Sequence, residues 1–195
     1  MKVFVFDNFG VVMNELSYIW EKRHLTSDRE LQERSDIGAE ADRDEISADE
    51  MFRKYGKMIK QTGPEVRAEW RGTVRVNWEV IDIVKDLRKN GYKVVMFSNA
   101  TSSILRDYMA SFGILDEFDR IFISSEMKLI KPEPESFKYV LSEMGVRAKN
   151  AMMIDDRERN IAAAEAMGME CILFADAPTL REKLEESGYL QKEAL

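Results

Sequence analysis

Three short apolar runs of this chain each end directly on polar side chains. VFVF is followed by Asp7, VVMF by Ser98 and Asn99, and MMI by Asp155 and Asp156. Short apolar runs separated by helical patterns are typical of buried parallel strands. The ends of such strands gather at one edge of an open α/β sheet, where these folds bind their ligands, so we expect these side chains to share one cleft. The pattern favours an enzyme.

The composition limits the partners of the chain. With 195 residues, the chain has room for one domain, or for one domain that carries an inserted module. Its formal net charge of −7 argues against nucleic acid or an anionic membrane surface as the main partner. No apolar run approaches the ~18 residues that a membrane span needs. The chain begins with a strand pattern in place of a signal peptide, and its single cysteine has no partner for an internal disulfide, so we expect a cytoplasmic protein.

From residue 77 onward, strand patterns alternate with helix patterns, which predicts a parallel sheet with right-handed crossovers. The predicted strands are residues 2–6, 93–97, 120–123, 151–154 and 170–174. Five helices are predicted in this part of the chain. The first follows Asn77, the next three cover residues 102–112, 134–144 and 158–167, and the last begins at about residue 178.

The segment between the first two strands has a different pattern. Residues 14–76 are charged, show helical periodicity and contain no convincing strand. A crossover between parallel strands needs only about a dozen residues, and more than sixty lie here. The surplus predicts a small helical module inserted into a core made of residues 1–13 and 77–195. Within it, Ser47 and Glu50 have the spacing of a capping box at a helix start.

Asp7 and the pair Asp155–Asp156 would bring three carboxylates together. Carboxylates about 4–6 Å apart repel one another by a few kcal/mol even when screened. A hard divalent cation relieves that repulsion, and Mg²⁺ accepts one or two carboxylates together with waters and phosphate oxygens. The structural alternatives are a turn capped by Asp7 beside Gly10, and a helix near Arg157 capped by one member of the pair. One cap residue suffices, so capping explains the pair less well.

Two further positions carry groups suited to an anion. Ser98 and Asn99 precede a predicted helix, where a hydroxyl and backbone N–H groups form an anion site or serve as an ordinary N-cap. Lys131 precedes Pro132, which favours an extended backbone, and Pro134 suits the first turn of the next helix. A lysine on such a stiffened backbone is suited to neutralise a carboxylate and bind a phosphate oxygen.

The motifs FDNFG, SN, KPEPESF and IDDRERN, in this order, resemble those of the haloacid dehalogenase-like hydrolase superfamily over nearly the whole chain. The resemblance implies an α/β fold with a Rossmann-like sheet of five parallel strands in the order 5-4-1-2-3 and helices on both faces. It also implies that residues 14–76 form a small α-helical cap.

The resemblance further implies a Mg²⁺-dependent phosphatase that acts on a small phosphorylated metabolite. In the family, an aspartate attacks the phosphoryl group and water then hydrolyses the aspartyl-phosphate. By this likeness Asp7 is the nucleophile, while Ser98, the Asn99 backbone N–H and Lys131 hold the transferring group. The expected Mg²⁺ ligands are the Asp7 carboxylate, the Phe9 backbone carbonyl and the pair Asp155–Asp156, with Asp156 as the direct ligand of the pair.

One position departs from the family pattern. Family phosphatases usually carry a second aspartate two residues after the nucleophile, as general acid and then base, where this chain has Phe9. Phenylalanine has no exchangeable proton, and general acid–base help is worth ~10²–10⁴-fold in rate. Phe9 therefore predicts faster turnover of aryl phosphates, whose leaving groups need no proton, than of alkyl phosphates.

Phe9 leaves three alternatives. The chain is a phosphatase that takes its acid from elsewhere, such as the cap or the substrate. It is a metal-independent 2-haloacid dehalogenase with Asp7 as nucleophile, since family dehalogenases tend to carry an aromatic residue here. Or it is a catalytically weak member that binds a phosphorylated ligand or a protein. The acidic pair favours the phosphatase, because dehalogenases of this family work without Mg²⁺.

Overall fold

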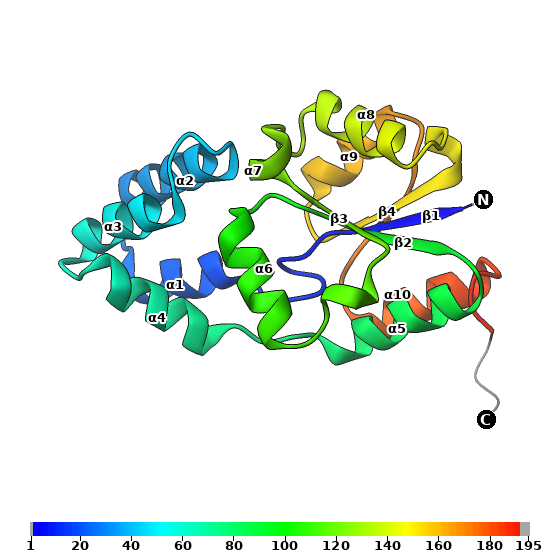
Figure 1. Cartoon of the computed structure of the whole chain (residues 1–195), viewed down its shortest axis with the longest axis horizontal. Coiled ribbons are helices and arrows are strands. Elements are labelled where there is room, and N and C mark those ends of the chain that lie inside the picture. The colour runs from blue at the N-terminus through cyan, green and yellow to red at the C-terminus, as the bar shows by residue number, and fades with distance from the viewer. Residues whose placement is uncertain (1, 192–195) are drawn as a thin grey trace.

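Five parallel strands form the centre of the structure (Figure 1). The computed structural model describes residues 2–191; Met1 and residues 192–195, at the two ends of the predicted core, lie outside this range. The strands are β1 (Val3–Phe6), β2 (Lys93–Ser98), β3 (Arg120–Ile123), β4 (Ala151–Asp155) and β5 (Glu170–Leu173). Their order, β3-β2-β1-β4-β5, is the predicted order counted from the other edge. The predicted α/β fold with a Rossmann-like parallel sheet is confirmed.

The register of β1 determines which residues meet at the carboxyl edge of the sheet. All four residues of β1 are buried, as expected for a central strand covered on both faces. Phe6 is paired with Met96 of β2 and with Ile154 of β4. The next residue along the chain, Asp7, therefore leaves the sheet level with Asp155.

Helices cover both faces of the sheet (Figure 1). One face packs on α5 (Trp78–Lys89), α6 (Ser102–Ser111) and α10 (Ala177–Glu186). The other face packs on α8 (Pro134–Glu143) and α9 (Glu158–Ala166). A short helix that the pattern did not predict, α7 (Ser124–Met127), follows β3 directly, and two 3-10 turns cover Leu115–Glu117 and Ala148–Asn150. Among the described residues, no helix has the length and apolar character to cross a membrane.

The segment between β1 and β2 is helical, as predicted. It contains α1 (Leu16–His24), α2 (Asp28–Asp42), α3 (Ala48–Ile59) and α4 (Gly63–Thr73). Its buried side chains, among them Trp20 and Phe52, belong to the same continuous hydrophobic cluster as Phe4 and Phe6 of the sheet. The two parts share one core, so the division into a cap and a core domain stays a prediction.

The capping box predicted at Ser47 is only half formed. The Ser47 hydroxyl accepts a hydrogen bond from the Glu50 backbone N–H at 3.2 Å. The Glu50 carboxylate does not return the bond, because it accepts from the Arg53 guanidinium one turn later, at 2.7 Å from Nε. Complete capping boxes begin two other helices of this segment: Ser27 with Glu30, and Thr62 with Glu65.

The shared core predicts that both parts of the chain unfold together. Phe52 is fully buried on α3 and packs edge-on against Trp70, with 5.5 Å between ring centroids. Phe52→Ala should lower the free energy of unfolding by ~3–5 kcal/mol. In urea titrations, tryptophan fluorescence and far-ultraviolet circular dichroism should shift together as one transition. The exposed aromatic of α1 gives the control, Tyr18→Ala, with an effect below ~0.5 kcal/mol. A fluorescence transition that moves alone would mean that α1–α4 unfold independently.

Candidate active site

The Lys131 side chain lies between two carboxylates at the carboxyl edge of the sheet. Its Nζ is 2.7 Å from Asp7 Oδ1 and 2.7 Å from Asp155 Oδ2. The exposed fractions of Lys131, Asp7 and Asp155 are 2%, 6% and 0%. Burial alone would favour a neutral amine, but the two carboxylates outweigh it and raise the pKa of Lys131 above its usual value. The ammonium group therefore stays charged in a site with almost no access to water.

Asp155 is the more completely bonded member of the acidic pair. Besides the lysine, its carboxylate accepts from the Arg157 backbone N–H at 2.9 Å and from Asn160 Nδ2 at 2.9 and 3.0 Å. These bonds join the end of β4 to the start of α9. The alternative in which Asp155 or Asp156 is the N-cap of that helix is wrong, because Arg157 holds the N-cap position without a side-chain cap bond.

Asp156 brings a third carboxylate to the same place. Oxygen atoms of Asp7, Asp155 and Asp156 all lie within 4.8 Å of one another. Asp156 Oδ1 is buried, and no group among residues 2–191 donates a hydrogen bond to it. The turn after β1 makes room for this side chain at Gly10, where φ is +95° and a Cβ atom would lie 2.4 Å from Asp156 Oδ2. Three converging carboxylates with an unpaired oxygen fit a hard divalent cation.

The carboxylates perturb one another. Burial raises the pKa of Asp7 to about 7; the Lys131 ammonium opposes the rise, and Asp155 and Asp156 add to it. Burial also raises the pKa of Asp156, against the effect of Arg157. Bringing a cation among these groups would lower both values, because it favours the charged forms.

Two buried polar side chains at this edge have no partner. The predicted strand ends at residue 97, directly before Ser98. In the structure Ser98 is itself the last residue of β2, because it pairs with Ile123 of β3. Its Oγ and both amide atoms of the Asn8 side chain are fully buried without a hydrogen bond to any described residue. An unpaired buried polar group costs ~1–3 kcal/mol, so these atoms mark a place where a ligand would supply the missing partner. The sequence pattern did not single out Asn8.

Asn99 holds the backbone of Lys131. Its Nδ2 donates to the Lys131 carbonyl and its Oδ1 accepts from the Lys131 N–H, both at 2.8 Å. Neither Ser98 nor Asn99 caps α6, whose N-cap is Thr101. The N–H groups around that helix start are bonded by two serine hydroxyls of α7, Ser124 and Ser125.

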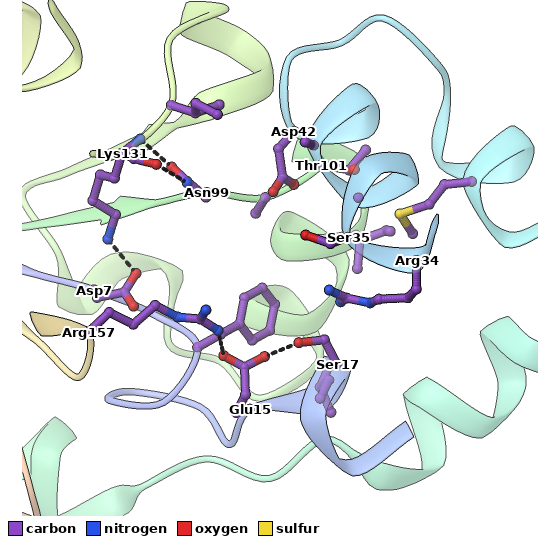
Figure 2. Close-up of a pocket in the computed structure, with 18 of the residues that line it drawn as sticks. Asp7, Glu15, Ser17, Arg34, Ser35, Asp42, Asn99, Thr101, Lys131 and Arg157 are labelled. Atoms are coloured by element: carbon purple, nitrogen blue, oxygen red, sulfur yellow. Dashed lines mark hydrogen bonds and ion pairs between the residues drawn. The ribbon is translucent and has the colours of Figure 1, made fainter. Parts of the chain in front are cut away.

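A cavity of about 290 Å³ lies between this edge and the helices α1–α4 (Figure 2). Its wall at the sheet edge includes Asp7, Phe9, Asn99, Lys131 and Asn160. Its wall on the helical side includes Leu16, Arg34, Asp42, Tyr55 and Trp70. Of the predicted site residues, Ser98, Asp155 and Asp156 do not line the cavity.

Several charged residues of the cavity wall were missed by the sequence analysis. Arg157 pairs with Glu15 at 2.7 Å, across 142 positions of the chain, and Glu15 also accepts from the Ser17 hydroxyl. Asp42 ends α2 on the helical side, and burial raises its pKa to about 7. The one signal for Asp42 in the sequence is an acid placed at the C-terminal end of a helix pattern, where the helix dipole disfavours negative charge.

Comparisons with known proteins relate the chain to a family of hydrolases. A family model described as haloacid dehalogenase-like hydrolase matches residues 1–168. A sesquiterpene phosphatase of Aspergillus oryzae is 26% identical over 146 residues, which cover 73% of this chain and 74% of that protein. A D-ribitol-5-phosphate phosphatase of Bacteroides thetaiotaomicron is 24% identical over 157 residues, 76% of each chain.

The fold is also found in solved structures. A HAD family enzyme of Bacteroides thetaiotaomicron, crystallised with magnesium and inorganic phosphate, superposes with a TM-score of 0.75 at 23% identity. The match covers 90% of this chain and 95% of that one, and it shows a shared fold.

The reciprocal bonds of Asn99 predict a measurable contribution to stability. Each bond is worth ~0.5–1.5 kcal/mol net, so Asn99→Ala should lower the free energy of unfolding by ~1–3 kcal/mol in urea titrations. Asn90 is a matched control, since it is exposed and makes one side-chain bond, to the Tyr189 carbonyl. If Asn90→Ala and Asn99→Ala lower the free energy of unfolding equally, the two bonds from Asn99 to the Lys131 backbone contribute no more than one exposed bond, which contradicts the prediction.

Proposed function

This chain belongs to the haloacid dehalogenase-like hydrolases, and we propose that it is a Mg²⁺-dependent phosphatase acting on a small phosphate ester. The observation that carries the proposal is the charged triad at the sheet edge. Lys131 lies between Asp7 and Asp155, and a carboxylate oxygen of Asp156 lies within 4.8 Å of oxygens of both aspartates. The similarity to two proteins named as phosphatases supports it.

We assign the cation to Asp7, the Phe9 backbone carbonyl and Asp156. Asp155 belongs to the same acidic cluster, but its oxygens already accept from Lys131, Asn160 and the backbone, so its role is to hold the lysine. When bound, Mg²⁺ neutralises phosphoryl oxygens and polarises the phosphorus toward attack.

The residues of the chain would then act in order. Asp7 Oδ2, the oxygen not bonded to Lys131, attacks phosphorus and forms an aspartyl-phosphate as the ester P–O bond breaks. Lys131 balances the negative charge of the phosphoryl oxygens, while the Ser98 hydroxyl and the Asn99 backbone N–H donate to them. Water next attacks the phosphorus, which releases inorganic phosphate and restores the Asp7 carboxylate.

We also propose that residues 14–76 act as the cap of this site. They supply the wall of the cavity opposite Asp7, so they would contact the organic part of the ester. The wall combines apolar rings with charged groups, which suits a substrate that has both characters.

A second candidate is a metal-independent 2-haloacid dehalogenase that uses Asp7 as nucleophile. Phe9 in the cavity wall favours it, because cleavage of a carbon–halogen bond needs no protonated leaving oxygen. The convergence of three carboxylates disfavours it, because without a cation they repel one another.

A parallel activity screen tests the proposed function. Purified protein, with Mg²⁺ or with EDTA, is incubated with a panel of phosphate esters and with 2-haloacids. We expect phosphate release only with Mg²⁺, and a loss of at least about 10⁴-fold in kcat for Asp7→Asn, because an amide is not a nucleophile here. Halide release without metal would support the dehalogenase. Turnover of neither class, or full activity of the Asp7→Asn variant, would sink the proposal.

Substitutions in the acidic pair should separate metal binding from stability. Asp156→Asn should weaken Mg²⁺ binding by about 100-fold or more in calorimetric titrations and leave the urea midpoint nearly unchanged. Asp155→Asn should instead lower the free energy of unfolding by ~3–5 kcal/mol, since it removes one partner of a buried ion pair. The reverse pattern, with metal binding lost only in Asp155→Asn, would make Asp155 the direct ligand.

A further inference from the structure

The proposed reaction needs a proton at the leaving oxygen, and the usual position for its donor holds Phe9. The donor must be an acid that lines the cavity on the side away from the nucleophile, because the leaving group departs opposite to the attacking oxygen. Within the described part of the chain, three acidic residues line the cavity: Asp7, Glu15 and Asp42. Asp7 is the proposed nucleophile, which leaves two candidates.

Glu15 is already engaged. One of its oxygens pairs with the Arg157 guanidinium at 2.7 Å, and the other accepts from the Ser17 hydroxyl (Figure 2). A carboxylate whose two oxygens already accept hydrogen bonds from neighbouring side chains is not free to contact a leaving oxygen.

Asp42 has the opposite surroundings. It comes from α2, and Figure 2 shows it across the cavity from Asp7, with no bond drawn to a neighbour. No hydrogen bond or ion pair connects its carboxylate to another residue of the described range. It is the last residue of α2, where helix carbonyls concentrate negative charge, and the last turn of that helix contains no basic residue.

The charged groups near Asp42 explain why it has no partner. Burial raises its pKa, Glu15 adds to the rise, and Arg34, Arg43 and Arg157 oppose it. Each arginine is committed to another carboxylate: Arg34 to Glu21, Arg43 to Glu133 and Arg157 to Glu15. The net result is a pKa of about 7, which suits an acid that must hold and release a proton near neutral pH.

We propose that Asp42 is the proton donor of this phosphatase, supplied by the helical segment in place of the residue replaced by Phe9. The inference rests on the proposed function. As the bond from Asp7 to phosphorus forms and the ester P–O bond breaks, the Asp42 proton passes to the leaving oxygen. The product alcohol departs and Asp42 becomes a carboxylate. Asp42 then accepts a proton from the water that attacks the aspartyl-phosphate, so inorganic phosphate forms and both aspartates return to their starting states.

The test compares two leaving groups with and without the carboxyl group. We would measure kcat and KM with Mg²⁺ for p-nitrophenyl phosphate, whose leaving group needs no proton, and for n-butyl phosphate, whose leaving group needs one. Asp42→Asn should lower kcat for n-butyl phosphate by ~10²–10⁴-fold and kcat for p-nitrophenyl phosphate by less than about tenfold, with little change in KM. The preference for aryl over alkyl phosphates that Phe9 predicts should then appear in the Asp42→Asn variant and not in the native protein.

A matched control is available two residues away. Asp44 is exposed, lies outside the cavity and has a left-handed φ of +62°, which asparagine adopts readily. Asp44→Asn should leave both kcat values unchanged.

The outcomes separate this inference from the proposed function. An equal loss on both substrates in Asp42→Asn, or no loss on either, overturns the role of Asp42 while phosphatase activity stands. Native protein that hydrolyses only the aryl ester also overturns it, because then no acid acts. Native protein that hydrolyses neither ester in this assay or the screen removes the proposed function and the inference together.

A stability measurement gives a second readout that needs no catalysis. The pKa of Asp42 is higher in the folded chain than in the unfolded chain, so ionising it costs stability as the pH rises from about 4 to about 7. Asparagine avoids this cost. The thermal midpoint of Asp42→Asn should therefore rise relative to the native chain across that window and keep a constant advantage above it. A difference that does not change with pH would overturn the protonated state that the inference requires.

Discussion

A buried ammonium group held between two buried carboxylates is the interaction on which the rest of the site depends. Lys131, in the loop before α8, contacts Asp7 and Asp155 at 2.7 Å each; Asp7 follows β1 directly and Asp155 ends β4. Taking such charges out of water costs several kcal/mol per ion, and only mutual pairing repays it. The strand register and the Asn99 bonds to the Lys131 backbone hold the three groups in place. The contacts that would position the reacting groups therefore also stabilise the fold at this edge of the sheet.

The cavity places two aspartates in contrasting surroundings. Asp7 contacts the Lys131 ammonium group and lies beside other carboxylates, whereas Asp42 lies near arginines that are paired with other carboxylates. Differences of this kind allow one kind of side chain to serve as nucleophile at one position and as acid at another. In this arrangement the sheet would provide the attacking group and the anion contacts, and the inserted helices would provide proton transfer and contacts to the organic group.

Sequence patterns predicted the fold and the residues at the strand ends because both depend on local features. An apolar run of four or five residues indicates a buried strand, and the polar residue that follows it indicates the edge of the sheet. The contacts that complete the site depend on distant segments: Asn99 bonds Lys131 across 32 positions and Arg157 bonds Glu15 across 142. No periodicity encodes such pairs. The half-formed capping box at Ser47 failed for a different reason, because Arg53 competes locally for the Glu50 carboxylate.

The hydrophobic core that α1–α4 share with the sheet has a consequence for how molecules reach the site. Moving these helices away as a rigid body would expose part of that core to water. At ~25 cal/mol per Å², exposing even about 200 Å² of apolar surface costs ~5 kcal/mol. Such an open state would be populated in roughly one molecule in several thousand, since each 1.4 kcal/mol is about tenfold. Rigid-body opening would therefore be rare, and a substrate would have to enter between the side chains that line the cavity.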